Sequence, residues 1–463
     1  MVFGFSKEVC IKKKMLSVFD NVSGEFDIED LTQVMGIRTS QTVRKYLNEI
    51  EELIATYYSP KELNLEVGKR GDIRLHRNGA NLDKLLEVLY TEDLVYKIYQ
   101  KLILTRVFST EEFCEQQQIS ISTLRRTITR MNHSLLNYDV SIKVGKKVSI
   151  VGDEAQIRFL FFEMLYFVHH SSSTIKWFDM KNYHQLSQQV CQAFYITPEL
   201  EQRNILSMWL FINQQSEDLD KGLAKDYFEE NYENYLPNEL FSSNIWKYIL
   251  LVMYALDFFN FEPELTFERM HQHQFSEITN QWMLLFEKYI HTLSSEEKAS
   301  LILTMYKYEL FHRILPNYRE ATFNFNPINE ETIKDDYPYF YLTLNRMWNE
   351  LASYSSLSIP KIVKDLLFSC TFQLASPEDL FPVVRCYLYS SLPQRNQQQL
   401  EKMIQYQLLS TAKIIFVTEE SHADILFTTN ASREGNLISV PIVEKDYIYI
   451  KNIIYAWIQK NED

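Results

Sequence analysis

Two stretches in the first third of the chain repeat the same plan, and this repeat restricts the fold more than any other feature. The first begins at Phe26 and reads FDIEDLTQVMGIRTSQTVRKYLNEIEELI, and the second begins at Phe108 and reads FSTEEFCEQQQISISTLRRTITRMNHSLL. In each, the aromatic residue is followed by a short capping residue, Asp27 or Ser109, and then by acidic residues that favour a helix start. Each stretch therefore predicts a short helix, a turn and a second helix.

The second helix of each stretch is amphipathic and basic. Apolar residues recur at steps of three or four, as at Val43, Leu47 and Ile50. The remaining surface carries basic side chains, and small polar residues precede the helix. A short helix, a tight turn and a basic helix form the helix-turn-helix plan, in which the start of the second helix enters the major groove of DNA.

A hairpin is expected after each basic helix, at 63–75 (LNLEVGKRGDIRL) and 140–151 (VSIKVGKKVSIV). Alternating apolar residues predict the strands, and Gly68 and Gly145 predict the turns. A basic hairpin after a recognition helix is a wing, which contacts phosphates or the minor groove. Because both features occur twice in the same order, we expect two winged helix-turn-helix domains, connected by helices within 82–105.

Charge is distributed unevenly along the chain. The formal net charge is −14, which alone argues against nucleic-acid binding. Residues 1–150, however, hold 22 Lys and Arg against 20 Asp and Glu, so the acidic excess lies in the remaining two-thirds. Local basic faces matter more for phosphate binding than the total charge. The predicted DNA contacts are residues of the two basic helices and the two wings: Thr39, Ser40, Gln41, Arg44, Lys45, Lys69, Arg70, Ser122, Thr123, Arg125, Arg126, Arg130, Lys146 and Lys147.

Composition argues against several other classes of protein. The five cysteines lie far apart and form no CxxC, so neither a disulfide framework nor a zinc site is expected. The pair His271 and His273 offers too few ligands for a metal site. The apolar stretches are shorter than the ~20 residues of a membrane span, and no signal peptide is recognisable. We expect a cytoplasmic protein without a cofactor or a membrane partner, and no P-loop, GxGxxG, HExxH or GxSxG motif indicates an enzyme.

The rest of the chain divides by its periodicity. Helical patterns dominate two segments, 156–275 and 276–378, whose lengths fit two helical bundles. In 379–463, short apolar segments at 383–389, 413–417, 424–428 and 438–443 alternate with helices, which predicts a small α/β domain with a parallel sheet. The chain is thus expected to be a mainly helical multidomain protein, with the first winged domain and the N-terminal segment in 1–80 and the second winged domain in 81–155.

This order of parts resembles the Mga/AtxA family of virulence regulators from Gram-positive bacteria. The resemblance covers nearly the whole chain and rests on the architecture and on two motif pairs, GIRTSQTVRKYL with VGKR and ISISTLRRTITR with VGKK. It implies that the bundles are similar to phosphotransferase-system regulation domains (PRDs) and that the tail is similar to a sugar-transporter IIB component that takes part in self-association. It also implies a homodimeric regulator of double-stranded DNA, expected to activate its targets, that senses carbon supply.

The chain departs from the family's pattern in the residues that would accept a phosphoryl group. A working IIB domain carries an acceptor Cys after its first strand, but here that place is Ser390-Ser391-Leu392-Pro393, and Cys386 lies within the strand. Without a thiolate there is no nucleophile, so the tail is expected to serve assembly. PRDs accept phosphate from a phosphohistidine carrier protein on an exposed neutral His, and the candidates are His184 and His312. An acceptor later in the second bundle is absent, because the next His is His422.

Two alternatives remain open. The first is a phosphotransferase-system component or phosphocarrier that uses its helix-turn-helix units for protein contacts, against which the missing Cys at Ser390 and Ser391 argues. The second is an RNA-binding antiterminator, which has similar bundles but begins with a small all-β domain unlike the helical repeat.

Few of the predicted DNA contacts suit bidentate recognition of bases. We therefore expect DNA shape to supply much of the sequence preference.

Overall fold

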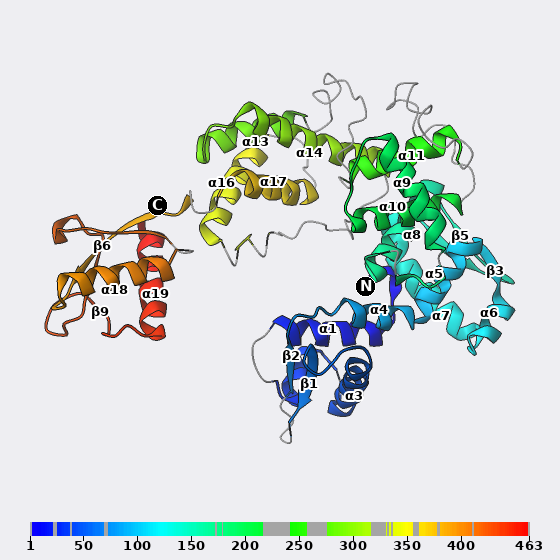
Figure 1. Cartoon of the computed structure of the whole chain (residues 1–463), viewed down its shortest axis with the longest axis horizontal. Helices are drawn as coiled ribbons and strands as arrows, with labels where there is room; N and C mark the ends of the chain where they lie inside the picture. Colours follow the sequence, from blue (N-terminus) through cyan, green and yellow to red (C-terminus); the bar gives the residue numbers. More distant parts are fainter. Residues whose placement is uncertain are drawn as a thin grey trace. The chain divides into compact units, whose positions relative to one another are not determined.

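Helices make up most of the computed structural model, together with small sheets (Figure 1). The chain divides into two compact units, Met1–Arg269 with Lys307–Phe323 and Met270–Tyr306 with Asn324–Asp463. None of the described helices is long and apolar enough to cross a membrane. The structure describes residues 2–21, 26–37, 39–68, 73–171, 174–177, 179–215, 241–256, 276–315, 330, 333–334, 337–354, 361–376, 380–409 and 412–461.

The first repeated stretch contains the predicted helices and hairpin. Asp27 caps the first helix by accepting a hydrogen bond from the N–H of Asp30 at 2.7 Å, and Thr39 caps the second by accepting from the N–H of Thr42 at 3.4 Å. The apolar stripe of the second helix is buried, as its period predicted. The elements are α2 (Ile28–Val34), α3 (Ser40–Tyr57), β1 (Leu63–Val67) and β2 (Ile73–Arg77).

The second repeated stretch has the same order of elements. Ser109 and Ser120 cap its two helices by accepting hydrogen bonds from the N–H groups of Glu112 and Thr123. Its sheet has one further strand, β3, which is too short to show a pattern in the sequence. The elements are the connecting helices α4 (Asp83–Thr91) and α5 (Leu94–Thr105), then β3 (Val107–Ser109), α6 (Thr110–Gln116), α7 (Ile121–Leu135), β4 (Ser141–Val144) and β5 (Lys147–Val151).

The repeat extends to the way in which each stretch completes its sheet. Phe26 pairs with Ile73 through two backbone hydrogen bonds of 3.1 and 2.7 Å. At the equivalent place in the second stretch, Phe108 pairs with Val148. The aromatic residue that opens each stretch thus joins the second strand of its own hairpin, so the two stretches are structural repeats.

Helix α1 (Lys7–Asn21) precedes the first repeat and shows no clear pattern in the sequence. The reason is Lys12, a charged residue that the helix buries together with its apolar ones. The Lys12 ammonium lies 2.8 Å from a carboxylate oxygen of Glu8 and 2.7 Å from one of Glu49. Pairing of this kind is what permits a lysine to be buried.

A helical bundle follows the second repeat in the same unit. Its central helix, α8, is buried on nearly every side. The buried charges of α8 have partners, because the Arg158 guanidinium lies 3.0 Å from Glu154 and the Tyr138 hydroxyl donates to Glu163. The helices are α8 (Glu154–His169), α9 (Met180–Ala193), α10 (Leu200–Gln214) and α11 (Ser243–Ala255).

The second unit combines further helices with a parallel sheet. The sheet has the order β7-β6-β8-β9 and is parallel throughout, as the alternation of strands and helices predicted. The last part of α14 belongs to the first unit. The elements are α13 (Ser276–Tyr289), α14 (Ser295–Ile314), α16 (Pro338–Tyr354), α17 (Lys361–Leu374), β6 (Val383–Tyr389), α18 (Gln394–Gln407), β7 (Lys413–Phe416), β8 (Ile425–Thr428), β9 (Asn436–Leu437) and α19 (Glu444–Asn461).

The predicted strand at 438–443 is wrong. The strand of this segment is β9, which ends at Leu437. Pro441 has no N–H and cannot extend a ladder of hydrogen bonds. The N–H groups of Ser439 and Val443 donate instead to the Asp446 carboxylate, at 3.3 and 3.0 Å, and prepare the start of α19.

Candidate nucleic-acid interface

Helices α3 and α7 each bury one face and expose the face on which the sequence predicts DNA contacts. The exposed face of α3 and its cap includes Arg44 and Lys45, and the side chain of Lys45 is 62% exposed although its ammonium lies 3.5 Å from Glu49. The predicted contacts that the structure places on these exposed faces are Thr39, Ser40, Gln41, Arg44, Lys45, Ser122, Thr123, Arg125 and Arg126.

The starts of α3 and α7 differ from those of α2 and α6 in a way that suits a phosphate. Both α2 and α6 carry two acidic residues in the first turn, whereas α3 and α7 carry none. A helix start bears a partial positive charge and free N–H groups, which attract an anion unless a carboxylate already occupies the place. At α7, the hydroxyls of Ser122 and Thr123 each lie 2.8 Å from that of Ser120 and form a polar cluster at this end.

The wing of the second repeat has a short turn between β4 and β5 that carries the exposed Lys146, and the exposed Lys147 begins β5. Thr110, at the start of α6, fixes this turn: its hydroxyl donates to the Gly145 carbonyl at 2.8 Å, and its N–H donates to the Lys146 carbonyl at 3.1 Å. Lys143, on β4, is also exposed and was not predicted as a contact, although the V-S-I-K alternation already pointed it to solvent. The wing is therefore held at a defined place beside the helix-turn-helix.

The corresponding wing residues of the first repeat, Lys69 and Arg70, lie outside the described residues. Arg130 is described and lies one turn after Arg126 on α7, but it is less exposed than Arg125 and Arg126. Its side chain is half-buried, and its Nε donates to the Gly4 carbonyl at 2.8 Å. The Nε donor of Arg130 is thus used by a backbone carbonyl of the N-terminal segment, which makes Arg130 a weaker candidate for a DNA contact than Arg125 and Arg126.

The two candidate phosphate acceptors have different surroundings. His184, on α9, is half-buried, and its Nδ1 lies 3.5 Å from the Ser207 hydroxyl. Burial, and then the positive charge of Arg203, hold the pKa of His184 below its usual value, so its imidazole is neutral at pH 7. Burial also lowers the pKa of His312, but the Nε2 atom of His312 is enclosed and has no hydrogen-bond partner among the described residues. His184 is thus the more accessible of the two.

The cysteine of the C-terminal domain is enclosed in the hydrophobic core. Cys386 is fully buried on β6, and burial raises the pKa of its thiol to about 12. The loop that follows β6 carries Ser390, whose hydroxyl accepts a hydrogen bond from the N–H of Leu392 at 3.0 Å. A serine hydroxyl is a weaker nucleophile than a thiolate.

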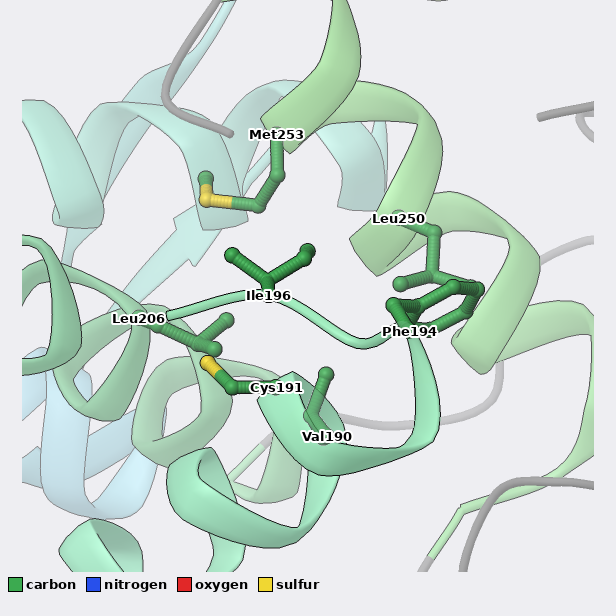
Figure 2. Close-up of a pocket in the computed structure, with 7 residues that line it drawn as sticks. All are labelled: Val190, Cys191, Phe194, Ile196, Leu206, Leu250 and Met253. Carbon is green, nitrogen blue, oxygen red and sulfur yellow. The ribbon is translucent and has the colours of Figure 1, made fainter. Parts of the chain in front are cut away.

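Other kinds of site have little support among the described residues. No three His, Cys, Asp or Glu side chains in this part of the chain lie close enough together to hold a metal ion, and His271 and His273 lie outside it. A small pocket in the helical bundle is lined by apolar side chains and the Cys191 thiol, whose pKa burial raises to about 11 (Figure 2). Such a lining offers no polar group to orient a substrate.

A comparison with known families agrees with the geometry of the second repeat. The model of the Mga helix-turn-helix domain matches residues 78–166. The match extends from before α4 into α8 and includes the whole second helix-turn-helix with its wing. No curated protein matches the chain. The match points to a DNA-binding transcription regulator.

Proposed function

We propose that this protein is a transcription regulator that binds double-stranded DNA through two winged helix-turn-helix domains, in residues 1–80 and 81–155. The observation that carries the proposal is the pair of structural repeats, each with an exposed basic helix whose first turn is free of acidic residues. The similarity of the second repeat to the Mga helix-turn-helix domain supports the same function.

In this proposal, each group of side chains has a role that follows from its chemistry. The guanidinium and ammonium groups of α3 and α7 neutralise phosphates or reach base edges, and the wing lysines contact the flanking backbone. The polar residues at the helix starts, such as Gln41 and Ser122, bind bases or phosphates. Lys69 and Arg70 serve as the wing contacts of the first domain.

The test is a salt series of binding titrations on bacterial promoter DNA with the full chain. Because each phosphate contact contributes about 1 to the slope of log affinity against log salt, Lys146→Ala/Lys147→Ala should lower the slope by ~2. The matched control is Lys402→Ala/Lys445→Ala, which removes two exposed lysines from the C-terminal domain. Equal slopes for all three proteins would count against the wing, and no binding at low salt would refute DNA binding and favour the phosphotransfer alternative.

We also propose that phosphotransferase-system phosphorylation of His184 controls the regulator, through bundles similar to PRDs. The neutral, partly accessible imidazole supports this choice, whereas the enclosed Nε2 of His312 makes that residue the weaker candidate. Incubation with the phosphorylated histidine carrier protein should label the wild type and the control His422→Gln, but not His184→Gln. Label that persists in His184→Gln refutes the choice, and rapid transfer of the label to a sugar would identify a transport component instead.

Finally, we propose that the protein forms a homodimer through its C-terminal domain. Alternate residues of β6 pack with α18 and α19, while Val383 and Ile415 on the other face of the sheet are each 43% exposed. The connection from β7 to β8 holds a single 3-10 turn, Glu420–His422, rather than a helix that would cover this face. Sedimentation should show that Ile415→Asp shifts a dimer towards monomer, whereas Tyr406→Asp, a control on α18, leaves it unchanged.

A further inference from the structure

The N-terminal segment is packed deeply within the first unit. Phe3 and Phe5 are 2% and 1% exposed, although they lie in a short irregular segment before α1. The Phe3 ring lies 6.2 Å from that of Tyr99 on α5 and 5.4 Å from that of Phe167 on α8. The Phe5 ring lies 4.7 Å from that of Tyr90 on α4. The segment thus fills a space bounded by α4, α5 and α8.

The same segment makes close contact with α7, the basic helix of the second repeat. Gly4 has φ +79°, a conformation that favours glycine, and a Cβ at this position would lie 2.6 Å from the Cα of Met131. The Arg130 guanidinium donates to the Gly4 carbonyl at 2.8 Å. Only a residue without a side chain allows the backbone to approach α7 so closely, and Arg130 then holds it there.

The next residues continue the attachment and lead into α1. The N–H of Ser6 donates to the carboxylate of Asp93 at 3.1 Å, and Asp93 also caps α5 by accepting from the N–H of Val95 at 2.8 Å. The ammonium of Lys13, on α1, lies 5.0 Å from the centre of the Phe167 ring. The start of α1 is therefore bound to the helices that carry the second repeat.

The rest of α1 is bound to the first repeat. Lys12 pairs with Glu49 of α3 at 2.7 Å, and Asp20 pairs with Arg77 of β2 at 2.7 Å. The ammonium of Lys14 donates to the Val34 carbonyl at the end of α2 at 3.1 Å. Figure 1 shows α1 next to this repeat, beside β2. One continuous segment thus contacts α2 and α3 of one repeat and α7 of the other.

We infer that Val2–Asn21 is a strap that holds α3 and α7 in one fixed relative position, so that the two helices bind a single composite DNA site at one spacing. This inference rests on the proposed DNA binding. Gly4, Phe3 and Arg130 are positioning residues in it, since they act on DNA only through the placement of α7. A rigid link between two binding modules raises affinity when their spacing matches the site and lowers it when it does not.

The first part of the test needs no DNA. Bioorthogonal spin labels at Glu52 of α3 and Thr129 of α7, both exposed, report the distance between the two helices in the full chain. The wild type and the control Lys7→Gln, an exposed residue of α1, should give one narrow distance distribution. Phe3→Ala and the milder Arg130→Gln should broaden it while circular dichroism stays unchanged. A narrow, unaltered distribution in Arg130→Gln and Phe3→Ala overturns the strap, whatever the protein binds.

The second part uses two DNA duplexes. The first is ~40 base pairs long and is selected from a random library by its binding to the full chain. The second is a copy with ~5 extra base pairs, half a helical turn, inserted between the regions covered by α3 and α7. The wild type should lose affinity for the lengthened duplex by on the order of 10-fold or more, whereas Arg130→Gln should bind the two duplexes almost equally. A wild type that ignores the insertion overturns the inference. Failure to bind any duplex refutes the proposed function. The distance between the labels on α3 and α7 then tests by itself whether the strap fixes the two helices.

Discussion

Arg126 and Arg130 lie one turn apart on α7, and the structure gives them different roles. Arg126 is exposed, whereas Arg130 is half-buried and donates to the Gly4 carbonyl at 2.8 Å. A change of either residue to Gln removes one positive charge from the same helix. We expect Arg126→Gln to weaken DNA binding and Arg130→Gln to loosen the packing of α7, so each variant is the matched control of the other.

The expected size of each effect follows from the kind of contact that the substitution removes. A hydrogen bond to a charged group contributes ~1.5–3 kcal/mol. At the lower end of that range, its loss makes local opening of α7 roughly 10 times more frequent. The loss of one phosphate contact lowers the slope of log affinity against log salt by ~1 and weakens binding similarly on all sequences.

Two measurements separate these effects. Hydrogen exchange of the α7 amides should be ~10-fold faster in Arg130→Gln and unchanged in Arg126→Gln. A salt titration on one duplex should show a slope lower by ~1 for Arg126→Gln and the wild-type slope for Arg130→Gln. If Arg130→Gln instead lowered the slope and left hydrogen exchange unchanged, Arg130 would be a phosphate contact and not a residue that positions α7.

Three further predictions concern single groups. Ser120→Ala removes the cap of α7 and should lower helix stability by ~1 kcal/mol, measured as faster hydrogen exchange in its first turns, whereas the exposed Thr129→Ala should change these amides little. Burial opposes the ionisation of Glu87, but hydrogen bonds from His169 and Thr174 outweigh it and hold the pKa of Glu87 below its usual value. The stability that results is present above pH ~4.5 and is lost as the pH falls through the folded-state pKa. Glu87→Gln should therefore lower the unfolding temperature at pH 7 and make that temperature depend less on acid pH, and an unchanged profile would contradict this. Because burial raises the pKa of the Cys386 thiol to about 12, iodoacetamide at pH 8 should modify Cys386 only after denaturation, which peptide mass mapping would show.

Much of the fold could be predicted from local patterns. The caps at Asp27 and Ser109, the buried stripe of α3 and the parallel C-terminal sheet all follow from residues a few positions apart, and the structure confirms them. Most of the exposed basic residues were found in the same way, because an amphipathic helix defines its outer face through its own period. The short strands β3 and β9 were missed or misplaced, since two or three residues carry no period.

Residue patterns alone were enough to predict two copies of a helix-turn-helix followed by a hairpin, and to predict the polar face of each basic helix. How those polar faces are held in place depends on contacts between distant parts of the chain. Arg130 fits the helical pattern of a DNA contact, yet its partner, Gly4, lies 126 residues away. Thr110 fixes a wing turn 35 residues further along the chain, and α1 pairs a buried lysine with α3. No local pattern reports such contacts, because they depend on how separate elements pack and not on the period within any one of them.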